Sequence, residues 1–229
     1  MKILVIEGLD GSGKSTQLKL IKDFLTNKGK KFKYIHFPTM DSPYFGQQIA
    51  RFLRGEFGKL NDVDPYIVAM MYAGDRFIAK DTINTWINNK NIVIIDRYVY
   101  SNIAYQCAKL KSTEEQQKLK NWIIDLEYNK YKIPKPDVSI FLDVPEKFTK
   151  QKLSTKRKGD DRKYLKDKTD IHEENLNFQS KVKKLYKSFA KDDIDYKIIN
   201  CSDDNGNILS PQKIHELIIA KICEYNFLI

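Results

Sequence analysis

With 229 residues, the chain is long enough to bury one sizeable core, and no apolar run reaches the roughly 20 residues that a membrane span needs. Its net charge of +10 is spread along the chain apart from a cluster near 150–168, which favours a solvated lysine-rich surface over a nucleic-acid or membrane partner. The three cysteines, Cys107, Cys201 and Cys223, are far apart and lack metal-type spacing, so we expect free, buried thiols in a reducing cytoplasm.

Five short apolar segments are typical of β-strands: Lys2–Ile6, Phe32–Phe37, Ile92–Ile95, Val138–Val144 and Tyr196–Ile199. The first runs directly into a glycine loop and has no small-residue cleavage site, so we interpret it as a buried strand and not a signal peptide. The third has four apolar residues without polar alternation, which is typical of a parallel sheet covered by helices on both faces.

Longer amphipathic stretches lie between these segments and predict helices over Lys14–Asn27, Pro65–Asn88, Glu114–Tyr131, Asp170–Phe189 and a last stretch from Ser210. Ser210 is a typical cap of that last helix, and the proline that follows suits its first turn. The alternation predicts an α/β fold: a doubly wound, five-stranded parallel sheet flanked by helices, forming one domain over residues 1–229.

A glycine-rich loop between the first strand and the first helix fits G-x-x-x-x-G-K-[ST] at every required position. Its glycines let backbone N–H groups surround phosphate oxygens, and the helix that follows directs its positive end at them. Lys14 can reach the β- and γ-phosphates, and the hydroxyl of Ser15 can bind Mg²⁺. The loop therefore predicts that the domain has the P-loop NTPase fold. The predicted triphosphate site consists of Gly8, Asp10, Gly11, Ser12, Gly13, Lys14, Ser15 and Thr16.

Two further features favour a small-molecule kinase. The segment Asn89–Ile92 fails the guanine motif N-K-x-D at its last position, and a large ATPase would need more chain. Asp96 and Arg97 follow a buried strand, and ligands of doubly wound sheets lie at such strand ends. Asp96 is therefore a candidate Mg²⁺ ligand near the loop, while Arg97 offers a forked cation to a second phosphate.

Together with the loop, the stretch Asp96–Gln106 (D-R-Y-V-Y-S-N-I-A-Y-Q) resembles the thymidylate kinase family. Phe37-Pro38, Tyr72–Arg76, Lys135–Asp137 and Asp170–Glu173 occur in the order and spacing of that family, from about residue 3 to residue 186. The loop alone is unspecific, whereas the D-R-Y-x-x-S-N-x-A-Y stretch is much more specific.

The resemblance implies transfer of the γ-phosphoryl group of ATP to dTMP, giving dTDP and ADP, with Mg²⁺ and in dTTP synthesis. It also implies a cytoplasmic homodimer, for which Pro65–Asn88 offers one contact face. The implied acceptor site consists of Asp10, Phe37, Pro38, Tyr72, Arg76, Arg97, Asn102, Tyr105 and Gln106.

In this site Tyr72 would stack on thymine, and Arg76 and Asn102 would contact the edge of the base. Arg97 would hold the acceptor's phosphate. Asp10 would face the 3′-hydroxyl, while Tyr105 would close against C2′ of the sugar and disfavour a ribonucleotide.

Each of these roles has a structural alternative on pattern alone. Tyr72 and Tyr105 fit a core helical face, and Asn102 fits a helix cap. Arg76 could pair with Asp75 or with a nearby acid at the surface. We interpret all three histidines as structural, because they lack metal-type spacing.

The basic segment near 150–170 resembles the mobile lid of nucleotide kinases, and its composition is too polar to bury a core. The loop carries no arginine, so the catalytic cation is expected from the lid, as in the bacterial subgroup: Arg157 first and Arg162 second. Both Asp161-Arg162 and Asp170-Ile171 partly match the motif that closes the lid, and the spacing to the next helix favours Asp170.

Relatives often carry Arg and Tyr after Phe37-Pro38, where this chain has Thr39-Met40, so Arg51 or Lys109 is expected to compensate. The predicted catalytic residues are Lys14, Asp96, Arg97 and Arg157. Two rival functions remain: a P-loop kinase for a nucleoside or another monophosphate, and a non-catalytic, nucleotide-dependent binder of nucleic acid.

Overall fold

The structure is a computed structural model that describes residues 2–154, 164–166, 170–172 and 176–225. Its sheet has five parallel strands in the order β2-β3-β1-β4-β5. The strands are β1 (Ile3–Glu7), β2 (Phe32–His36), β3 (Ile92–Asp96), β4 (Val138–Asp143) and β5 (Tyr196–Asn200). Each predicted strand is confirmed to within one residue at either end, and so is the doubly wound parallel sheet.

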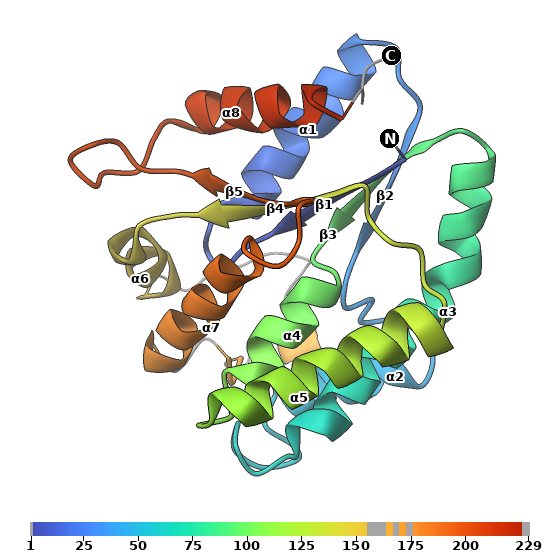
Figure 1. The fold of residues 1–229 in the computed structure, drawn as a ribbon, viewed down its shortest axis with the longest axis vertical. Coiled ribbons are helices and arrows are strands. Elements are labelled where there is room, and N and C mark those ends of the chain that lie inside the picture. The colour runs from blue at the N-terminus through green and yellow to red at the C-terminus, as the bar shows by residue number, and fades with distance from the viewer. Residues whose placement is uncertain (1, 155–163, 167–169, 173–175, 226–229) are drawn as a thin grey trace.

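Helices cover both faces of the sheet (Figure 1). One face is covered by α1 (Lys14–Asn27) and α8 (Pro211–Cys223), and the other by α3 (Pro65–Asn88), α4 (Val99–Cys107) and α7 (Leu176–Phe189). A further helix, α5 (Thr113–Ile124), packs on α4, and α2 (Phe45–Leu53) packs on α3. The carboxyl ends of the strands and the adjoining helix starts lie at one edge, where ligands of such sheets bind.

The side chains of β1 explain why both faces are covered. Ile3 and Val5 belong to the core beneath α3, α4 and α7, whereas Leu4 and Ile6 belong to the core beneath α1 and α8. All four are buried, so alternate residues of one strand pack into two separate cores. At the last helix, the side chain of Ser210 accepts a hydrogen bond from the backbone N–H of Lys213, which confirms the predicted cap.

Two predicted helices differ from the structure. The stretch predicted as one helix over Glu114–Tyr131 is α5 followed by a π-helical segment, η1 (Asp125–Lys130), whose wider turn carries Glu127 into the interior. The helix predicted from Asp170 is described from Leu176, and Asp170 to His172 form a turn. Short helices α2, α4 and α6 (Glu146–Ser154) were not predicted, because each is under three turns long.

The basic segment also differs in its described part. Helix α6 continues through Ser154, and Leu165 is only 4% exposed, so this segment does bury an apolar side chain. Among the cysteines, Cys107 and Cys201 are free and buried as expected, whereas Cys223 is exposed. Within the described ranges no helix is both long and apolar enough to cross a membrane.

Candidate active site

The glycine loop between β1 and α1 encloses the side chain of Lys14. Gly11 and Gly13 adopt left-handed backbone angles, with φ of 73° and 84°, which side chains rarely tolerate. Lys14 Nζ donates to the carbonyl oxygens of Leu9 (2.9 Å) and Gly8 (3.2 Å). Burial, together with the charge of Arg97, lowers the pKa of Lys14 to about 8. Among the described residues no carboxylate lies at ion-pair distance from this ammonium group, which suits an incoming phosphate.

Asp96 ends β3 beside β1, in register with Ile6. Burial alone would raise the pKa of its carboxyl group, but the hydrogen bond from His36 and the charge of Lys14 outweigh burial and lower it. The His36 Nδ1 to Asp96 Oδ2 distance is 3.1 Å, whereas Oδ1 has no partner among the described residues. Ser15 is exposed in the first turn of α1.

These two residues fit a magnesium ion. Mg²⁺ usually takes one or two protein oxygens and completes its shell with water and substrate phosphates. An unpartnered carboxylate oxygen on Asp96 and an exposed hydroxyl on Ser15 supply that donor set. Among the described residues no group of three or more His, Cys, Asp or Glu side chains could hold a metal by itself.

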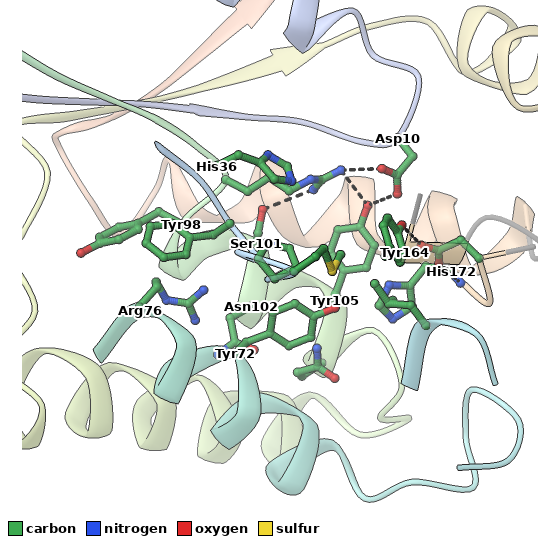
Figure 2. Close-up of a pocket in the computed structure, with 17 residues that line it drawn as sticks. Asp10, His36, Tyr72, Arg76, Tyr98, Ser101, Asn102, Tyr105, Tyr164 and His172 are labelled. Carbon is green, nitrogen blue, oxygen red and sulfur yellow. Dashed lines mark hydrogen bonds and ion pairs between the residues drawn. The ribbon is translucent and has the colours of Figure 1, made fainter. Parts of the chain in front are cut away.

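A cavity opens beside the loop and contains about 790 Å³ of empty space, counting the part open to solvent. Its walls include every residue of the predicted acceptor site: Asp10, Phe37, Pro38, Tyr72, Arg76, Arg97, Asn102, Tyr105 and Gln106. The chain brings these residues together from five separate segments (Figure 2).

Arg97 is held at both ends of its guanidinium group. Nη2 donates to Asp10 Oδ1 (2.8 Å) and to the hydroxyl of Tyr105 (3.4 Å), which itself donates to Asp10 Oδ2 (2.9 Å). Nη1 donates to Ser101 Oγ at 3.3 Å (Figure 2). Burial would lower the pKa of Arg97, but the neighbouring oxygens, chiefly those of Tyr105 and Asp10, raise it well above its usual value. Asp10 thus connects the loop to the cavity.

Arg76 is buried and faces a carboxylate from η1. Its Nε and Nη2 donate to the two oxygens of Glu127 at 2.5 and 2.6 Å, and neither side chain is more than 2% exposed. The pairing is bidentate, which is the strongest arrangement of these two groups. The alternative of a surface pair for Arg76 is therefore wrong, and Asp75 instead accepts the backbone N–H of Thr39 (2.8 Å).

Asn102 and Gln106 line the cavity and carry buried polar atoms that have no partner among the described residues. The amide nitrogen of Asn102 donates to Ala69 O and to Glu127 Oε1, both at 3.0 Å, and its Oδ1 has no partner among the described residues. Both amide atoms of Gln106 are buried and unpartnered within the same ranges. Buried polar atoms are nearly always hydrogen-bonded, so these three atoms indicate a bound ligand or water. Asn102 lies within α4 and does not cap it.

Sequence reasoning missed several residues of the cavity wall, including Tyr98, Ser101 and Tyr164. It also interpreted the histidines as structural, yet His36 and His172 line the cavity. Burial, aided by the charge of Lys109, lowers the pKa of His172 to about 3, so this ring is neutral. His36 precedes the motif Phe37-Pro38, and His172 lies within the motif Asp170–Glu173. Their place at these motifs could have identified both as cavity residues.

The two residues expected to compensate at Thr39-Met40 do not line this cavity. Arg51 hydrogen-bonds Glu56 and lies in an adjoining hollow, and Lys109 Nζ lies 4.6 Å from the ring centre of Phe52. The lid residues Arg157 and Arg162 lie outside the described residues.

Comparison with known proteins identifies the family. The family model described as thymidylate kinase matches residues 6–210. A Thermococcus kodakarensis protein described as a probable thymidylate kinase is 34% identical over 226 residues, which is 96% of either chain. Plasmodium falciparum thymidylate kinase is 29% identical over 195 residues, covering 84% of this chain and 79% of its own length.

Among solved structures, the thymidylate kinase of Candida albicans superimposes with a TM-score of 0.72 and 25% identity, covering 99% of this chain and 92% of that one. The family model, the relatives and the solved structure agree with the loop and the cavity beside it. The chain therefore belongs to the thymidylate kinase family, the nucleoside monophosphate kinases that use ATP to phosphorylate dTMP.

Proposed function

We propose that the glycine loop binds the ATP phosphates and that the adjoining cavity binds dTMP, so that the two nucleotides meet near Asp10. The observation that carries this proposal is the gathering of all nine candidate acceptor residues around one cavity that shares Asp10 with the loop. The acceptor's phosphate is already anionic near neutral pH, so transfer needs positioning and charge stabilisation more than a strong base.

The unpartnered atoms of the cavity match the edge of thymine, which offers one N–H donor and two carbonyl acceptors. Asn102 Oδ1, which has no partner in the part of the chain that the structure describes, can accept the N–H, and the amide of Gln106 can donate to a carbonyl. Tyr72 supplies the aromatic face for stacking, and Arg76 is fixed by Glu127 against the same wall. Tyr105 is expected to exclude a 2′-hydroxyl.

The cations divide between the two nucleotides. Lys14 interacts with the ATP phosphates, and Arg97 holds the phosphate of dTMP. When Mg²⁺ is bound by Ser15 and Asp96 it neutralises charge on the ATP phosphates. A lid over about 150–170, within one kinase domain of residues 1–229, supplies the last cation from Arg157 or Arg162.

We also propose a cytoplasmic homodimer that is joined through α3. Exposed apolar side chains along this helix support it: Tyr66, Ile67, Met70, Phe77 and Ile78, each 36–51% exposed. A contiguous exposed apolar face is typical of a contact between proteins. Light scattering should give a dimer for wild type and a monomer for Phe77→Lys. Ile194→Lys, at another exposed apolar position, should remain dimeric.

The acceptor specificity is tested by a panel of acceptors with purified protein, reading ADP formation with dTMP, dUMP, dCMP, UMP and thymidine. We expect dTMP to give the highest kcat/KM and thymidine to give none, because Arg97 needs a phosphate to hold. Turnover with thymidine would favour the rival nucleoside kinase. Salt-sensitive DNA binding without acceptor-dependent ADP release would favour the non-catalytic rival.

A further inference from the structure

Glu7, the last residue of β1, is fully buried and is not among the residues that line the cavity. A buried carboxylate is costly unless its oxygens accept hydrogen bonds. Here both oxygens do: Oε1 accepts the backbone N–H groups of Tyr98 (3.0 Å) and Ser101 (3.3 Å), and Oε2 accepts the hydroxyl of Ser101 at 2.5 Å. Tyr98 lies in the turn from β3 into α4, and Ser101 lies in the first turn of α4.

That turn contains Arg97, whose backbone is in the left-handed region with φ of 64°. A bulky residue reaches this conformation only where surrounding contacts impose it. The N–H of Arg97 donates to Ile6 O at 3.0 Å, and the next residues are fixed by the Oε1 atom of Glu7. The cap residue of α4, Tyr98, makes no side-chain capping bond, and Glu7 on β1 instead accepts the N–H groups of Tyr98 and of Ser101 in the first turn of the helix.

The second oxygen of Glu7 acts on the guanidinium group through a hydroxyl. Ser101 has a single proton, and its donation to Glu7 Oε2 leaves the Oγ lone pairs directed at Arg97 Nη1, which donates to them at 3.3 Å. The hydroxyl of Tyr186 lies within reach of the same three groups: 2.7 Å from Ser101 Oγ, 3.4 Å from Glu7 Oε2 and 3.5 Å from Nη1.

We infer that Glu7 is a positioning residue for the acceptor's phosphate, because it fixes the side chain of Arg97. It holds the strained turn, and it orients the hydroxyl groups that accept from Arg97 Nη1, while Asp10 accepts from Nη2. This inference rests on the proposed role of Arg97. Glu7→Gln would replace Oε2 by an amide nitrogen, which donates to Ser101 and turns the hydroxyl proton toward Arg97. The guanidinium group would then lose an acceptor and face a donor.

The test is a double-mutant cycle that compares Glu7→Gln in the wild-type background and in an Arg97→Lys background. In the wild-type background Glu7→Gln should raise the dTMP KM about tenfold, as expected for a lost hydrogen bond to a charge, and leave the ATP KM within about twofold. In the Arg97→Lys background the same change should have little further effect. Melting curves of all variants establish that the fold is kept.

Ser101 provides an independent variant in case Glu7→Gln does not fold. Ser101→Ala should raise the dTMP KM in the same way, and Ser101→Thr, which keeps the hydroxyl, should restore it. Ser139→Ala, a buried hydroxyl deletion on β4 away from the cavity, should leave both KM values unchanged. If Glu7→Gln raises the dTMP KM equally in both backgrounds, or not at all in wild type, the inference on Glu7 is wrong, while the proposed role of Arg97 stands. An unchanged dTMP KM in Arg97→Lys would overturn the acceptor role of Arg97 and this inference with it.

Discussion

The glycine loop and the acceptor cavity meet at Asp10, yet they are built differently. The loop is eight consecutive residues whose backbone surrounds one buried cation, Lys14, which donates to the carbonyl oxygens of Gly8 and Leu9. The cavity is lined by side chains from distant segments, and each of the two arginines in its wall already faces a carboxylate. We therefore expect the activity of the loop to depend on single residues such as Lys14, and the cavity to depend on paired residues. The following variants test that difference.

Lys14→Ala should have the largest effect, because no second cation of the described loop can replace its ammonium group. We expect kcat to fall by on the order of 10³ or more, as for other cations that neutralise a transferred phosphoryl group. The measurement is dTMP-dependent ADP formation. Near-normal turnover would exclude the loop as the triphosphate site.

Arg157→Ala should lower kcat by on the order of 10²–10³ and change the dTMP KM much less, because a lid cation acts mainly in the transition state. Arg162→Ala is the matched comparison and should have the smaller effect. A raised dTMP KM with unchanged kcat would instead assign Arg157 to ground-state binding.

Glu127→Ala should destabilise the fold by about 3–5 kcal/mol, because it leaves Arg76 buried without its carboxylate. Urea unfolding followed by circular dichroism measures the loss. Glu114→Ala breaks an exposed pair with Lys118 and should change stability little. If the two variants lose equal stability, the buried pair is not the structural element that we describe.

Tyr105→Ala should lower the preference for dTMP over ribo-TMP, measured as the ratio of kcat/KM, by roughly tenfold. Its ring packs against His172 and Tyr186, so the ring itself and not the hydroxyl should set the ratio. Tyr105→Phe is therefore expected to keep it. An unchanged ratio in Tyr105→Ala would show that Tyr105 does not discriminate against the 2′-hydroxyl group.

Lys109 gives the smallest effect, which depends on pH. Burial lowers its pKa to about 7 from 10.5. Between these values the unfolded chain binds the proton more tightly, so the wild-type free energy of unfolding rises with pH in this window. Lys109→Met should be more stable than wild type below pH 7, and its advantage should shrink by about 1 kcal/mol from pH 7 to pH 8. A constant difference would contradict a buried ammonium group.

Much of this fold could be predicted from the sequence, because buried parallel strands and phosphate loops leave contiguous patterns. The run Ile92–Ile95 and the loop up to Ser15 are such patterns. The pairing of Arg76 with Glu127 could not be predicted, since 51 residues separate them and a π-helical turn directs the glutamate inward. Glu7 left a partial signal, an acid that ends a fully apolar strand.

Nine cavity residues were found by motif, but the hydrogen bonds and ion pairs that their side chains make were not. A motif records which residues recur in a family, whereas hydrogen bonds such as that from Tyr105 to Asp10 depend on the packing of distant segments. Tyr164 was missed for the same reason, because it lies in the basic segment near 150–168 and only the fold brings it to the cavity.

The most direct test of the division between loop and cavity is calorimetric titration of dTMP and ATP into wild type, Lys14→Ala and Asn102→Ala. Lys14→Ala should bind dTMP within about threefold of wild type although it no longer transfers a phosphoryl group. Asn102→Ala should weaken dTMP binding about tenfold and leave ATP binding unchanged. Loss of dTMP binding in Lys14→Ala, or equal weakening of both nucleotides in Asn102→Ala, would contradict two separate sites.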